Sequence, residues 1–78
     1  MPRFFFHLHN GEDCRDTEGV ELANIDAAHQ EALRSARSIM AGEVIEGRLP
    51  LRDVIEVEDE AGATVTRLPF RDAVEIED

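Results

Sequence analysis

The sequence has one closely spaced pair of side chains that could bind a metal, His7 and His9. Alternate residues of a strand project from the same face, so two imidazoles at this spacing could hold one zinc ion. Glu12, Asp13 or Cys14 could add a ligand from across a turn. No second close-spaced ligand pair exists, however, and two semi-exposed polar residues on a strand explain the same pattern. A small metal- or ligand-binding domain using His7 and His9 is therefore the alternative interpretation.

The other reactive side chains do not predict catalysis. Cys14 has mainly acidic neighbours, which disfavour a reactive thiolate, so we expect it to be a partly buried small residue. Ser35 and Ser38 have no histidine base nearby in sequence, and the chain has no glycine-rich phosphate loop. Its acidic clusters match no calcium-loop pattern and are typical of a solvated surface. We expect a domain that is not an enzyme and needs no cofactor.

Composition limits the partners. The 78 residues include 18 acidic and eight basic side chains, all of the latter arginine, and the net charge is −10. The aromatic run Phe4-Phe5-Phe6 is similar to the stacking platform of RNA-binding sheets, but this charge opposes contact with phosphates, so we expect no nucleic-acid partner. No apolar run approaches the ~20 residues that cross a membrane. The single cysteine excludes an internal disulfide, and we expect a cytoplasmic protein with one domain spanning residues 1–78.

The N-terminal third predicts a β-hairpin. Residues 3–9 alternate so that Phe4, Phe6 and Leu8 share one face, which we expect to be the core face. Residues 10–13 have turn chemistry. A second strand then extends to about residue 22, and residues 17–19 interrupt it.

The middle of the chain predicts one long helix. Asn24 or Asp26 can cap its start, and Gly47 suits the left-handed position just after its end. Apolar residues recur every three or four positions between these limits. The row formed by Ala28, Ala32 and Ala36 would let the helix lie close to a sheet.

The remaining residues predict a second hairpin. Residues 54–58 and 63–68 read as strands on either side of a turn, with Ile55 and Val57 toward the core and Leu68 and Phe70 closing its edge. Residues 74–77 could form a short last strand or an extended tail. The order β-β-α-β-β predicts an α+β fold of two layers, an antiparallel sheet of about four strands with one helix on one face.

Four short motifs cover both ends and the middle of the chain. They are Met1-Pro2-Arg3 with the aromatic run and His7, Glu18-Gly19-Val20-Glu21-Leu22, Glu31-Ala32-Leu33-Arg34, and Pro69-Phe70-Arg71-Asp72-Ala73-Val74. In these motifs the sequence resembles a family of short bacterial domains of unknown function. The resemblance implies family membership and no activity.

One helix cannot cover both faces of the predicted sheet, and a domain this small has a core of marginal size. We therefore expect a non-enzymatic interaction domain that forms a homodimer or binds another protein, through the uncovered face or an edge strand. An apolar centre ringed by charges is typical of such an interface. The alternatives are that the tail covers Phe5 through Val74 and Ile76, or that the apolar residues of this face are isolated surface residues. The predicted interface residues are Arg3, Phe5, His7, Val54, Glu56, Val65 and Arg67.

Overall fold

The N-terminal hairpin forms as predicted, and its second strand is in two pieces. In the computed structural model, which describes all residues 1–78, the central strand is β1 (Arg3–His9). Two short strands, β2 (Asp13–Cys14) and β3 (Val20–Glu21), pair antiparallel with opposite ends of its outer edge. The polar residues between them interrupt the ladder.

Helix α1 (Ile25–Ile45) begins and ends at the predicted residues. The Asn24 side-chain oxygen accepts a 2.8 Å hydrogen bond from the Ala27 backbone N–H and so caps the first turn. At the other end Gly47 has a φ of +90°, and the backbone N–H of Arg48 donates to the Glu43 carbonyl. These bonds form the glycine-dependent Schellman ending, which stops the helix there.

The second hairpin completes the sheet. Strand β4 (Val54–Glu58) pairs with β1, and β5 (Thr64–Pro69) pairs with the other side of β4. The strand order is β2-β1-β4-β5, with β3 also on β1, and all pairings are antiparallel. The model therefore confirms an α+β fold, with five strands rather than about four because the interrupted strand counts twice.

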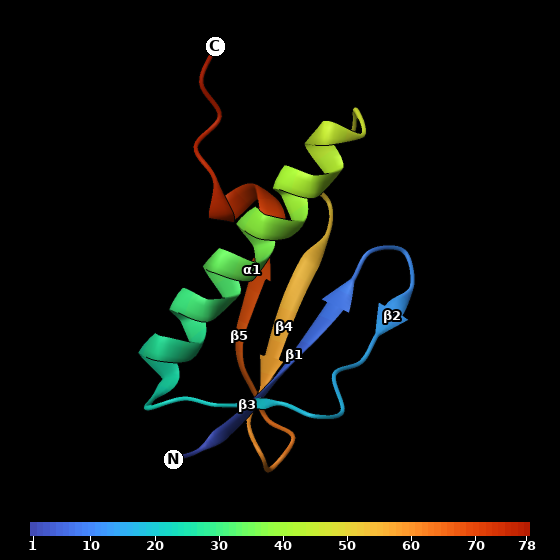
Figure 1. The fold of residues 1–78 in the computed structure, drawn as a ribbon. Helices are drawn as coiled ribbons and strands as arrows, with labels where there is room; N and C mark the ends of the chain where they lie inside the picture. The colour runs from blue at the N-terminus through green and yellow to red at the C-terminus, as the bar shows by residue number, and fades with distance from the viewer.

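The helix packs on one face of this sheet, mainly over β4, β5 and the short 3-10 helix η1 (Phe70–Ala73) (Figure 1). Ala28, Ala32 and Ala36 are fully buried, so the backbone of α1 approaches the sheet closely, as expected. The predicted core residues Phe4, Ile55, Val57, Leu68 and Phe70 are also buried. Phe6 and Leu8 point to the same side but are only half-buried, because α1 is displaced toward β5.

The opposite face of the sheet has no helix and no tail on it. Residues 74–78 form no strand; they leave η1 beside α1 and run toward the end of the molecule where α1 ends (Figure 1). The Arg37 guanidinium donates a 2.7 Å hydrogen bond to the Ala73 carbonyl and holds the start of the tail on the helix side. The alternative in which Val74 and Ile76 cover Phe5 is therefore wrong.

The molecule is elongated and has a large surface for its mass. Its radius of gyration is 12.7 Å, against about 11.5 Å for a compact domain of this length. Its accessible surface is 5307 Å², against about 4,700 Å² expected from its mass. The apolar part of this accessible surface includes well-exposed side chains at the C-terminal end of α1 and just beyond it: Val44, Ile45 and Leu49. Its one long helix is not apolar enough to cross a bilayer.

Candidate interaction face

We call the sheet surface away from α1 the open face, and the register shows which side chains meet on it. Phe5 lies opposite Glu58, His7 opposite Glu56, and His9 opposite Val54. Arg67 of β5 lies opposite Glu56. Arg3 belongs to the same face by alternation along β1. Six of the seven predicted interface residues therefore share this face: Arg3, Phe5, His7, Val54, Glu56 and Arg67.

Val65, the seventh, lies on the other side. The β4–β5 ladder shifts register between Val57 and Glu58, so Val65 is an extra residue on β5. Val65 packs against the core and lines a hollow with Phe4 and Ile25, at the start of α1. Simple alternation along β5 predicted the wrong face because a bulge changes the parity.

The open face is more polar than predicted. The well-exposed large apolar side chains of the strands and of α1 do not lie on it, and Val54 is only 9% exposed. Phe5 is half-buried, with its ring against Gly19. The predicted apolar centre is therefore reduced to parts of Phe5 and Val54, and hydrogen-bonded charged side chains occupy most of the face.

His7 is the most buried polar residue of the face, at 2% exposure, whereas the sequence predicted a wet, semi-exposed position. The backbone N–H of Asp16 donates to its Nδ1 at 3.0 Å. The proton of a neutral ring is therefore on Nε2, which lies 2.8 Å from Glu58 Oε1 and donates to it. Arg15 Nη2 donates to the same oxygen at 3.1 Å. His7 thus links the sheet to the chain between β2 and β3.

Asp16 completes the edge of the sheet where the second strand is interrupted. Its Oδ2 accepts a hydrogen bond from the Phe6 backbone N–H at 3.1 Å, and its Oδ1 accepts from the N–H groups of Glu18 and Gly19. Burial alone would raise the pKa of Asp16, but these three backbone hydrogen bonds lower it below its ordinary value. No sequence motif indicated this role, because Asp16 acts on a residue ten positions away.

His9 lies between two carboxylates. Its Nδ1 is 2.8 Å from Asp13 Oδ1, and its Nε2 is 3.0 Å from Glu56 Oε1. The hydrogen bond to Asp13, followed by that to Glu56, raises the pKa of His9 above its ordinary value. The pKa of Glu56 is lowered, first by the hydrogen bond from the Thr64 hydroxyl and then by His9. His9 and Glu56 therefore form a charge-assisted pair that stabilises the imidazolium.

The predicted metal ligands do not converge. Both ring nitrogens of His7 and of His9 already have protein partners, and no group of three or more potential ligands is placed to hold a metal. Cys14 is exposed rather than partly buried, because β2 lies at the edge of the sheet. A metal at His7 and His9 would have to displace the carboxylate partners of both rings.

Comparison with known proteins gives one match. The family model described as Domain of unknown function (DUF6894) covers residues 3–71, which include the whole sheet, α1 and the start of η1. No curated protein and no solved structure matches the chain.

Proposed function

The chain belongs to the DUF6894 family, a domain of unknown function, and from its structure we propose that it is a non-enzymatic protein-interaction domain that self-associates through the open face. One observation carries the proposal: a single helix covers one side of the sheet, and the other side presents ordered side chains of both charges. Ordered charges of both signs allow a face to match a rotated copy of itself.

The positions of the charges support contact between two copies of the face. Arg67 is exposed and takes part in no ion pair, while Glu56 and Glu58 of the neighbouring strand are half-buried in the histidine network. A rotated second copy would bring its arginine to these carboxylates. Half-buried pairs of this kind are screened less than fully exposed ones.

The edge of the sheet is a poorer contact than its face. On one side, β2, β3 and the Asp16 side chain occupy the outer edge of β1. On the other, β5 carries the exposed Arg67, ends at Pro69, which has no N–H to donate, and contains the bulge at Val65. Charge, proline and bulges are the features that prevent edge-to-edge pairing. We therefore favour the face over the edge strand.

The test is the charge reversal Arg67→Glu, measured by sedimentation velocity and light scattering over a concentration series. We expect the wild-type chain to self-associate and the variant to associate about tenfold more weakly, the equivalent of one lost charge pair. The matched control is Arg34→Glu, which changes the net charge equally on the outer surface of α1, where the side chain is exposed. A wild-type monomer at all concentrations would overturn the proposal, as would equal behaviour of the two variants.

A further inference from the structure

A second surface lies at the end of the molecule where α1 begins, outside the open face. It is a shallow hollow formed by the chain at the start of β1, the first turn of α1, and β5 with the hairpin before it. Phe4, Ile25 and Val65 make it apolar, and Ile25 is 52% exposed although it is a large aliphatic residue. The lining residues are Pro2, Phe4, Asn24, Ile25, Asp26, Asp59 and Val65.

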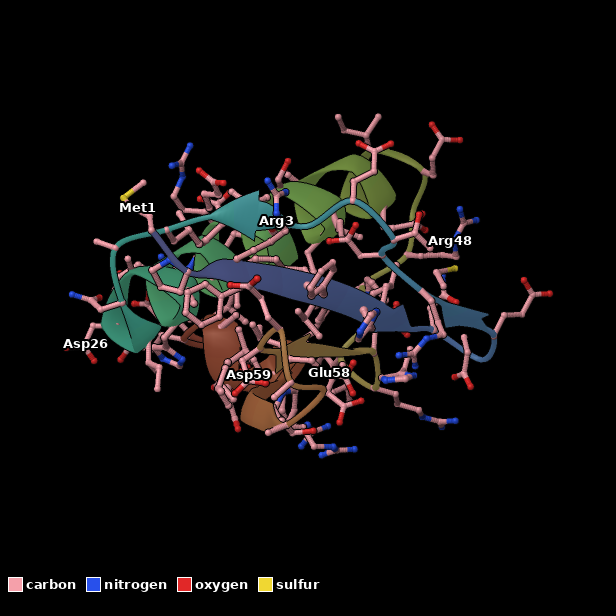
Figure 2. The ribbon with its side chains drawn as sticks, turned by 90° about the horizontal axis from the view of Figure 1, so that it is seen from below. Met1, Arg3, Asp26, Arg48, Glu58 and Asp59 are labelled. Atoms are coloured by element: carbon pink, nitrogen blue, oxygen red, sulfur yellow. The ribbon has the colours of Figure 1, made fainter.

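The charge at this hollow is negative. Asp26 and Asp59 line it, and neither takes part in any of the ion pairs of the structure. Figure 2 shows Asp26 on the side of the molecule that carries Met1, away from Arg48. The Asp59 Oδ1 accepts hydrogen bonds from the Ala61 and Ala63 N–H groups, but no cation faces either carboxylate. An apolar hollow with carboxylates that lack a cation favours an occupant that has an apolar side chain between cations.

The opposite end of α1 presents such a segment, residues 48–52. Leu49 is 53% exposed, and Arg52 is exposed and in no ion pair. Arg48, which precedes Leu49, is exposed and uses its Nε to pair with Glu43 Oε2 at 2.8 Å, so only its two terminal nitrogens remain for a partner. The segment has a fixed conformation, because the Schellman ending at Gly47 sets its direction and the Leu51 and Asp53 N–H groups donate to the carbonyls of Leu49 and Pro50. A segment already ordered loses little entropy when it binds.

We propose that the hollow of one copy binds Leu49 of a second copy, with Arg48 and Arg52 of that copy against Asp26 and Asp59. The 21 residues of α1 separate the two surfaces by about 31 Å, so a copy cannot fill its own hollow. The contact joins two different surfaces, head to tail, and each added copy leaves one hollow and one segment free. It does not depend on the open face.

The experiment uses two variants, Ile25→Asp in the hollow and Leu49→Asp in the segment, both made in the Arg67→Glu background to weaken contact through the open face. Both sites are more than half exposed, and an acidic residue in the first turn of a helix is favourable, so both variants should fold, as circular dichroism would verify. We expect each variant alone to be a monomer in sedimentation velocity at up to about 1 mM protein, where the Arg67→Glu parent forms larger species.

The decisive sample is an equimolar mixture of the two variants. Ile25→Asp retains an intact segment and Leu49→Asp retains an intact hollow, so one contact can form and assembly must stop at a heterodimer. A heterodimer in the mixture supports the proposal. It is overturned if the mixture stays monomeric, if either variant alone associates as the parent does, or if the parent is itself a monomer. Residual association through the open face would be the same in each variant alone and in their mixture, so only a species that forms in the mixture and in neither variant alone reports the head-to-tail contact.

Discussion

At the residue scale, side chains replace backbone pairing in the middle of the outer edge of β1. The Phe6 N–H has no strand partner, because it lies between β2 and β3. It donates a hydrogen bond to the Asp16 carboxylate, and the Asp16 N–H in turn donates to the His7 ring. An unpaired buried backbone donor would cost about 1–3 kcal/mol, which explains why a charged side chain is kept at this point. The network is fully paired, since no buried side-chain polar atom lacks a partner.

Gly19 is the residue in this network least able to change. Its φ is +72°, and an added Cβ would lie 2.9 Å from both the Phe4 carbonyl oxygen and Phe5 Cε1. We expect Gly19→Ala to lower the free energy of unfolding by about 3 kcal/mol, because strain at positive φ and the clash add together. Gly62→Ala is the control: its φ is +84° but the space around it is open, so only the smaller conformational cost of about 1 kcal/mol applies. Equal losses in urea unfolding would contradict the close approach at Gly19.

His9 makes stability depend on pH. Its pKa is raised in the folded chain, so its contribution to stability is fully present below its unfolded value of 6.5 and is lost as the pH rises through the higher folded value. We expect the melting temperature of the wild type to fall relative to His9→Gln between about pH 6 and pH 8. Asp13→Asn should weaken this dependence, because the hydrogen bond to Asp13 is the main cause of the raised pKa. A constant difference between wild type and His9→Gln across this range would show that folding does not raise the pKa of His9.

At the element scale, α1 has two well-formed ends and a row of small residues between them. Both ends use hydrogen bonds that local sequence specifies, and the buried alanines bring its axis close to β4 and β5. The helix therefore has a defined length. That length sets the separation of the hollow at its start from residues 48–52 at its end.

The Asn24 cap gives a prediction for this element. Asn24→Ala removes the acceptor of the Ala27 N–H and should lower the free energy of unfolding by about 1 kcal/mol. Asn24→Asp keeps an acceptor of the same reach and should restore most of the loss. Urea unfolding followed by circular dichroism measures both variants, and a loss that persists in Asn24→Asp would mean that the amide, rather than its oxygen, is needed.

At the scale of the whole molecule, the extents of 39 × 24 × 16 Å describe a thin, long body rather than a sphere. Its surface exceeds that expected for its mass by about 600 Å², approaching the ~800 Å² that each partner buries in a standard interface.

The salt dependence of assembly distinguishes the two proposed contacts from purely apolar association. Both contacts rely on arginine–carboxylate pairs, so we expect assembly to weaken as ionic strength rises from about 0.05 to 0.5 M. Light scattering that shows stronger assembly in high salt would point to exposed apolar residues such as Ile45 instead.

The sequence by itself determined the elements and their order, because capping, turns and apolar periodicity depend on residues close together in the chain. Asn24, Gly47 and the alternation through Ile55 and Val57 were sufficient for α1 and the second hairpin. Only the tertiary structure decided how the open face is composed. Three features of this face depend on contacts between segments that are far apart in the sequence. They are the burial of His7, the hydrogen bond from Phe6 to Asp16, and the bulge that turns Val65 to the core side. Local patterns do not encode these long-range pairings, so six of the seven predicted residues share one face, but that face is less apolar than predicted.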